Sequence, residues 1–154
     1  MILLPSPPLS SISRPEPGAF AALMDLYESN YINMRRLVPS LPNCSNHLIS
    51  QVPNGLDLHL HLLERTRYTS EVSLTYQFNQ GGTIFVEPNL HIRVYHDARL
   101  AEVLAAHLRH LPAFDADSLI AHRTDGAHLH RRWKINRFLF KWLHYCLRQG
   151  HRFA

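Results

Sequence analysis

Residues 128–149 have the periodicity of a single long amphipathic helix. Large apolar side chains recur at steps of three and four, which places them on one face of a helix with 3.6 residues per turn. This face consists of Ile135, Phe138, Leu139, Trp142, Leu143, Tyr145 and Cys146. Because it is wider than the roughly 100° stripe that a surface helix usually buries, we predict that the helix is part of the core.

The opposite face of this helix carries a stripe of basic residues. Its members are His130, Lys134, Arg137, Lys141, His144 and Arg148. Residues 122–154 contain eight Arg or Lys and one Asp, whereas residues 1–121 contain eight basic and eleven acidic residues. This concentration of positive charge is typical of an anion-binding face, but a solvated helix face beside acidic neighbours gives the same pattern.

The middle of the chain has the two-residue period of β-strands. Two runs alternate apolar and polar residues on either side of a polar connection, so they should pair as an antiparallel hairpin. The glycines within residues 79–82 indicate a second turn. The predicted strands cover residues 47–52, 56–63, 72–78 and 83–96, the last either continuous or divided at Pro88.

Helical periodicity also predicts two shorter helices. Residues 19–37 have apolar side chains at steps of three and four and end before Pro39. Residues 98–110 follow Asp97, whose carboxylate is suited to accept the free N–H groups of a first helical turn. In this second helix Leu100, Val103 and Leu104 would be buried. A polar connection over residues 112–127 then leads to the basic helix.

These elements predict an α+β fold. No helix separates the strands, so the sheet should be antiparallel with four or five strands, preceded by the N-terminal helix and covered by two C-terminal helices. A chain of 154 residues fits one domain, which we place at residues 18–154. Residues 1–17 hold five of the ten prolines and have no apolar periodicity, so we expect a disordered tail.

Composition and motifs exclude several classes of protein. No apolar run approaches the roughly 20 residues that cross a bilayer, and no secretory signal begins the chain, so we expect a cytoplasmic protein. Cys44 and Cys146 lie far apart without a CxxC motif, which agrees with a reducing compartment. The phosphate-binding and acyl-transfer motifs built on glycine-rich turns are absent, and we expect no cofactor.

The end of the last predicted strand offers a candidate ligand site. An arginine, a tyrosine and the start of a predicted helix would form a pocket for a small anion, and an enzyme could use His96 or Glu102 there as a general base. Alternatively, Asp97 only caps the helix and Arg93 pairs with an acid such as Glu64. The candidate ligand residues are Arg67, Arg93, Tyr95, His96, Asp97 and Glu102, together with Lys134, Arg137 and Lys141 of the stripe.

Twelve histidines raise the question of a metal site. His59 and His61 project from the same face of one strand, His128 and His130 recur later, and two more histidines lie within residues 98–110. Zinc sites need three or four converging ligands, and no spacing in the sequence fixes a third. We therefore predict no metal site.

Four segments resemble the YqiB-like proteins of proteobacteria. They are residues 28–39, 64–69, 93–103 and 134–150, of which the string Arg93-Val-Tyr-His-Asp-Ala98 is the most distinctive. The resemblance extends over residues 18–150, and the proline-rich start and the His59/His61 pair depart from the family's pattern. It implies a bacterial cytoplasmic domain of unknown function, with no catalytic residue to carry over. Genes of the family lie near enzymes of cyclic-AMP and ADP-ribose breakdown in enterobacteria, which implies a link to nucleotide metabolism.

Three functions remain open at this point. The first is a non-catalytic binding or regulatory module for an anionic ligand, such as a nucleotide or another phosphate-bearing molecule. The second is a small enzyme that acts on a phosphorylated substrate through His96, Asp97 and Glu102. The third is a protein–protein adaptor or homodimer. Nucleic-acid binding is less favoured because no nucleic-acid recognition motif is present, and we expect no membrane partner.

Overall fold

The computed structural model describes residues 19–107, 114–115 and 125–154. The predicted disordered tail at residues 1–17 lies outside these residues. The elements are α2 (Phe20–Leu37), the short 3-10 helix η1 (Leu41–Asn43), β1 (His47–Ser50), β2 (Asp57–Arg65), β3 (Thr69–Gln80), β4 (Thr83–Tyr95), β5 (Leu100–His107), β6 (Phe114–Asp115) and α4 (Asp125–Arg148). The α+β class and the N-terminal helix are confirmed.

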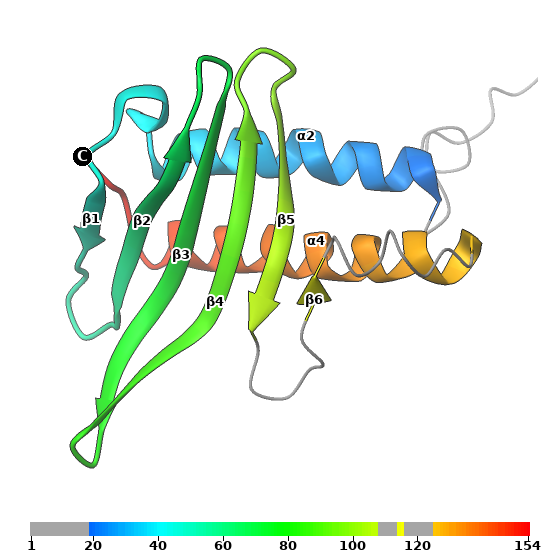
Figure 1. Ribbon diagram of the computed structural model, residues 1–154. Coiled ribbons are helices and arrows are strands. Elements are labelled where there is room, and N and C mark those ends of the chain that lie inside the picture. The colour runs from blue at the N-terminus through cyan, green and yellow to red at the C-terminus, as the bar shows by residue number, and fades with distance from the viewer. Residues whose placement is uncertain (1–18, 108–113, 116–124) are drawn as a thin grey trace, which may run out of the picture.

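All strands belong to one antiparallel sheet, in which they follow chain order from β1 to the two-residue β6 (Figure 1). The five longer strands agree with the predicted four or five. The alternation predicted the buried face correctly, because Leu60 lies opposite Leu48 on one side and Leu74 on the other. Strand β4 runs without interruption through the cis Glu87–Pro88 peptide bond, so it is not divided at Pro88.

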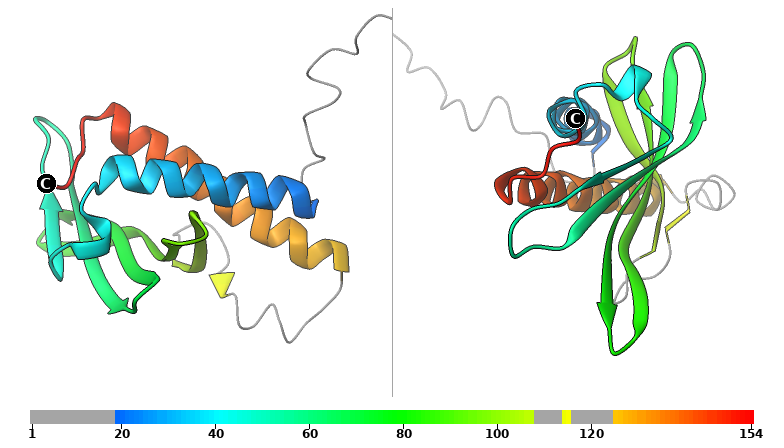
Figure 2. Two further views of the ribbon diagram at one scale, coloured as in Figure 1. Left: turned by 90° about the horizontal axis from the view of Figure 1, so that it is seen from above. Right: turned by 90° about the vertical axis from the view of Figure 1, so that its left-hand side faces the viewer.

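Helices α2 and α4 lie on the same face of the sheet and run across its strands (Figures 1 and 2). The core between the helices and the sheet is apolar, as the periodicity of both helices predicted. Its fully buried side chains include Leu37, Leu74, Ile92, Leu139 and Leu143. Side-chain burial of this kind contributes about 1.5–3 kcal/mol for each large apolar residue before conformational entropy is subtracted.

The prediction of a helix at residues 98–110 is wrong. Residues 100–107 form strand β5, which pairs with β4, and residues 108–110 lie outside the described part of the chain. Asp97 therefore caps no helix; its Oδ1 accepts the N–H of Ala98 in the turn between the strands. The local sequence is rich in good helix formers, but pairing with β4 outweighs this weak preference. One C-terminal helix, not two, is present among the described residues.

A buried asparagine joins α4 to strand β5 and to α2. Asn136 Oδ1 accepts the backbone N–H of Val103 at 3.0 Å, and its backbone oxygen accepts the side-chain amide of Asn30 at 3.1 Å. Both asparagines are fully buried, and a buried amide is stable there only when it is hydrogen-bonded. Directional hydrogen bonds as well as apolar packing thus fix helix α4 against strand β5.

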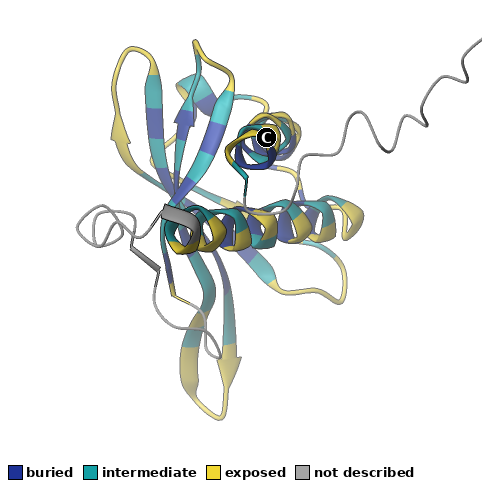
Figure 3. Ribbon diagram, turned by 90° about the vertical axis from the view of Figure 1, so that its right-hand side faces the viewer, coloured by how far each residue is buried: buried dark blue, intermediate teal, exposed yellow. Residues whose placement is uncertain are grey.

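Helix α4 begins at Asp125, three residues before the predicted start, and it is buried along one side and exposed along the other (Figure 3). The predicted apolar face is confirmed except at Tyr145, which is 45% exposed. The predicted basic face is correct except at His144, whose Nε2 lies 3.3 Å from Asn33 Nδ2 of α2. Neither described helix combines the length and apolarity that crossing a membrane requires.

Candidate functional site

The sheet face opposite the helices, which we call the outer face, carries a network of charged and hydroxyl side chains. The register places Glu71 of β3 opposite Arg93 of β4, and Arg93 opposite Glu102 of β5. Arg93 donates to Glu71 Oε1 from Nε at 2.7 Å, and His91 Nε2 lies 3.1 Å from Glu71 Oε2. The hydroxyl of Tyr95 donates to Glu102 Oε1 at 2.5 Å. Three candidate ligand residues therefore lie in one hydrogen-bonded row.

The cation of this row is already paired within the protein. Arg93 forms its ion pair with Glu71, not with Glu64, because the strand register brings Glu71 directly opposite. Arg132 of α4 approaches the other end of the row, with Nη1 3.4 Å from Glu102 Oε2. An anion that bound to Arg93 would have to displace a carboxylate, so the row is better suited to stabilising the sheet than to holding a ligand.

The pairing of Glu71 predicts a loss of stability in acid. Burial alone would raise the pKa of the Glu71 carboxyl, but hydrogen bonds and charge from Arg93, with a contribution from His91, hold the pKa below its usual value. A group whose pKa is lower in the folded state adds stability above its unfolded pKa, and this contribution is lost as the pH falls through the folded pKa. We expect the free energy of unfolding to fall below about pH 4.5, and to fall less steeply in Glu71→Gln.

Urea unfolding of both proteins at pH 7, 5, 4 and 3.5 measures this difference. At neutral pH the variant should be the less stable of the two, because Arg93 loses its partner, and the gap should narrow as the pH is lowered. Parallel pH profiles would show that Glu71 titrates alike in the folded and unfolded chain.

His96 and Asp97 lie apart from the outer-face row. His96 Nε2 is 2.8 Å from the hydroxyl of Ser70, which is fully buried on the helix side of the sheet. Tyr95 and His96 are consecutive and point to opposite faces, as successive residues of an extended chain do. Arg67 is exposed in the neighbouring turn, with its guanidinium carbon 5.3 Å from the ring centre of Tyr68. The candidate set predicted from the sequence therefore occupies separate places.

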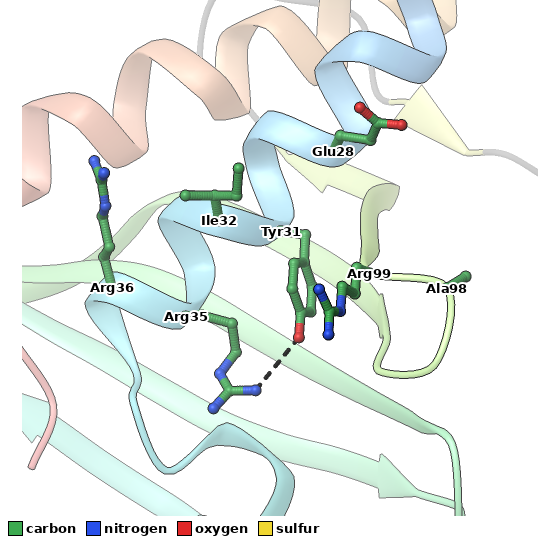
Figure 4. A pocket seen from close by; sticks show the side chains of 7 residues that line it. All are labelled: Glu28, Tyr31, Ile32, Arg35, Arg36, Ala98 and Arg99. Carbon is green, nitrogen blue, oxygen red and sulfur yellow. Dashed lines mark hydrogen bonds between the residues drawn. The ribbon is translucent and has the colours of Figure 1, made fainter.

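A different group of arginines surrounds an open pocket of about 690 Å³ between α2 and the turn that joins β4 to β5 (Figure 4). Its lining residues are Glu28, Tyr31, Ile32, Arg35 and Arg36 of α2, with Ala98 and Arg99 of the turn. The lining contains three guanidinium groups and one carboxylate, so it has an excess of positive charge. Arg99 has a φ of 57°, a left-handed conformation that is uncommon for a residue with a side chain.

Two buried nitrogen atoms, one on Arg35 of the pocket and one on His96, have no hydrogen-bond partner in the protein. Arg35 donates from Nη1 to the hydroxyl of Tyr31 at 3.4 Å and from Nη2 to the backbone oxygen of Pro39 at 3.0 Å, while its buried Nε has no hydrogen-bond partner. Nδ1 of His96, which is not one of the residues that line the pocket, is also buried without a partner. Burial lowers the pKa of His96, and the charges of Arg35 and Arg65 lower it further. This end of the sheet is therefore electropositive.

The sequence held a signal for this pocket that its analysis missed. Arg35 and Arg36 occupy the last turn of a helix, where Tyr31 and Ile32 lie one turn earlier on the same side. Two adjacent arginines beside a tyrosine are a plausible anion-binding surface, but the contribution of Arg99 depends on the turn between two strands. That turn could not be placed while residues 98–110 were assigned to a helix.

The basic stripe of α4 faces solvent. Lys134, Arg137 and Lys141 are exposed, and none takes part in the three ion pairs found in the described part of the chain. The guanidinium of Arg137 lies 5.0 Å from the ring centre of Trp133. These side chains come from one helix surface, whereas the arginines that line the pocket come from two elements.

Comparison with known proteins places the chain in a family. The family described as "Protein of unknown function (DUF1249)" matches residues 33–152. The chain belongs to this family. The "Uncharacterized protein YqiB" of Escherichia coli K12 is 33% identical over 133 residues, which cover 85% of this chain and 90% of that protein. The YqiB protein of Escherichia coli O157:H7 gives the same values. The predicted resemblance to YqiB-like proteins is thus confirmed, and no solved structure matches the chain.

Proposed function

We propose that this protein is a non-catalytic, cytoplasmic binding module for a small phosphate-bearing ligand, and that the ligand occupies the pocket between α2 and the β4–β5 turn. The observation that carries the proposal is one open pocket that Arg35, Arg36 and Arg99 line together with a single carboxylate, Glu28. The free and buried cysteines Cys44 and Cys146 are compatible with a reducing compartment.

The chemistry of the lining favours phosphate over other anions. A guanidinium group is planar, stays charged at any physiological pH and donates paired hydrogen bonds to phosphate oxygens. Hydrogen bonds to Tyr31 and Pro39 hold the side chain of Arg35 in place. Part of its conformational entropy is therefore lost before a ligand binds. The pocket volume of about 690 Å³ is within the range of small-molecule sites. Ile32, which is half exposed, supplies an apolar wall for a larger organic group.

The enzymatic alternative has less geometric support than the binding module. His96 faces Ser70 on the helix side of the sheet, whereas Glu102 is bonded to Tyr95 on the outer face. A general base and its acid partner must reach the same substrate atom, and the separate hydrogen-bond partners of His96 and Glu102 do not favour such an arrangement. The adaptor alternative is supported only by exposed surface. No contact among the described residues adds support for a protein-binding face.

Removal of Arg99 is the direct test. Its side chain is exposed and its φ of 57° suits glycine, so Arg99→Gly removes one guanidinium without straining the turn. We expect the affinity for AMP and inorganic phosphate to fall at least about tenfold, since a hydrogen bond to a charged group contributes about 1.5–3 kcal/mol. Isothermal titration calorimetry in low and moderate salt, with metal-free protein, measures this change.

Arg137→Ala is the matched control. It removes the same charge from the exposed stripe of α4, so it lowers the net charge equally without touching the pocket. We expect it to change affinity by no more than about twofold. Equal weakening by both substitutions, together with loss of binding in moderate salt, would instead indicate diffuse attraction to the stripe. No saturable binding of either anion by the unsubstituted protein would refute the proposed function.

A further inference from the structure

Three histidines meet at the outer face of the sheet, on strands β1 and β2. His59 and His61 are two residues apart on β2, so both point away from the buried Leu58 and Leu60. The antiparallel register places His47 of β1 directly opposite His61. The third ligand that the sequence spacing could not supply therefore comes from the neighbouring strand.

The nitrogen atoms of these side chains are already close. His47 Nε2 lies 3.0 Å from His59 Nδ1, and one ring nitrogen from each of the three histidines can be chosen so that all lie within 4.8 Å of one another. Two imidazole nitrogens on one tetrahedral zinc ion, each at about 2.0–2.1 Å from the metal, are roughly 3.3 Å apart. The separation between His47 and His59 is close to this value. These two nitrogens are hydrogen-bonded to each other in this structure, so the rings would have to turn before their lone pairs could meet at one ion.

The ring arrangement shows which side chains would move. The rings of His47 and His61 are stacked, with centres 4.1 Å apart and planes at 13°, so their nitrogen lone pairs do not yet converge. His59 is 8% exposed, whereas His47 is exposed and its ring centre lies 5.3 Å from that of His59. The exposed side of His47 gives an ion a route of entry from solvent.

Burial and neighbouring charge act on the two histidines of β2. Burial lowers the pKa of His59 and of His61, and the neighbouring His47 lowers both further. The carboxylate of Asp57 on the same strand acts on His59 electrostatically and adds negative charge near the three rings.

We propose that His47, His59 and His61 bind a divalent transition-metal ion, most suitably Zn²⁺, and leave a coordination position open to water or another ligand. Imidazole is a preferred ligand of zinc, and three histidines with a free fourth position form a recurrent zinc-binding set. The ion would also join β1, an edge strand, to β2. This site is separate from the arginine pocket, and neither requires the other.

Zinc titration of the full chain, prepared without a polyhistidine tag and in phosphate-free buffer, tests the site. We expect one saturable equivalent of Zn²⁺ by calorimetry, and visible absorption of four-coordinate Co²⁺ when cobalt replaces zinc. His47→Ala should weaken zinc binding at least about tenfold and abolish the cobalt spectrum. His107→Ala, which removes an exposed histidine of β5, is the matched control and should leave both unchanged.

A second variant, with folding checks on both, distinguishes the loss of a metal ligand from misfolding. His61→Asn removes another ligand on β2, and both ligand variants are checked by circular dichroism and by their melting temperature without metal. If both are folded and bind zinc as the original protein does, the proposal is refuted. It is refuted equally if the original protein shows no saturable zinc binding, or if His107→Ala loses as much affinity as His47→Ala.

Discussion

The substitution Leu139→Ala is expected to lower the free energy of unfolding by about 2–5 kcal/mol. Leu139 is 0% exposed and lies in the core between α4 and the sheet, so its truncation removes buried methyl groups and leaves a cavity that close-packed neighbours fill only in part. Urea unfolding followed by circular dichroism measures the change. The size of the effect depends on how far the surrounding core collapses.

Leu63→Ala is a suitable control, because the same side chain is 53% exposed at this position of β2. We expect a change of no more than about 1 kcal/mol there. If Leu139→Ala were as mild as Leu63→Ala, α4 would not be the integral part of the core that its apolar face indicates. A large effect at Leu139 with none at Leu63 would confirm that the side chain of Leu139 is part of the core.

Periodicity was sufficient to predict the elements whose local pattern and tertiary environment agree. Helix α2 starts one residue from its predicted position, and the strands before residue 97 lie close to their predicted bounds. Strand β5 shows the opposite case. Its run of Leu, Ala and Glu suits a helix locally, and only the presence of β4 as a hydrogen-bonding partner decides for a strand. A single sequence does not contain that information in its spacing.

The predicted site residues lie apart for the same reason, at the level of side chains. Alternation correctly placed Arg93 and Tyr95 on one strand face, but the identity of the partner, Glu71 instead of Glu64, depends on strand register. Likewise the pocket combines one turn of α2 with a turn between strands, and His47 reaches His61 only across a strand pair. Residues that meet through long-range pairing are the part that single-sequence reasoning could not supply.

The C-terminal residues illustrate a contact that no periodicity predicts. After α4 the chain turns at Gly150, whose φ of 93° is readily available only to glycine, and then runs back against the core. His151 Nδ1 lies 2.9 Å from the hydroxyl of Ser50, and the N–H of Phe153 donates to the backbone oxygen of Leu37 at 2.8 Å. The side chain of Phe153 is only 1% exposed. This short segment therefore joins the ends of α2 and α4 to the start of the sheet.

We expect Phe153→Ala to lower the free energy of unfolding by about 3–5 kcal/mol, because it removes a large buried ring. The backbone hydrogen bond from residue 153 to Leu37 can still form in this variant, so the loss reports on the side chain. Denaturant unfolding measures the loss, and Phe20→Ala is the control, since that ring is 64% exposed at the start of α2 and should contribute less than about 1 kcal/mol. A loss near 1 kcal/mol or less at both positions would mean that residues 150–154 separate readily from the core. A large loss at Phe153 alone would show that the last residues stabilise the arrangement of α2 against the sheet, on which the position of Arg35 and Arg36 depends.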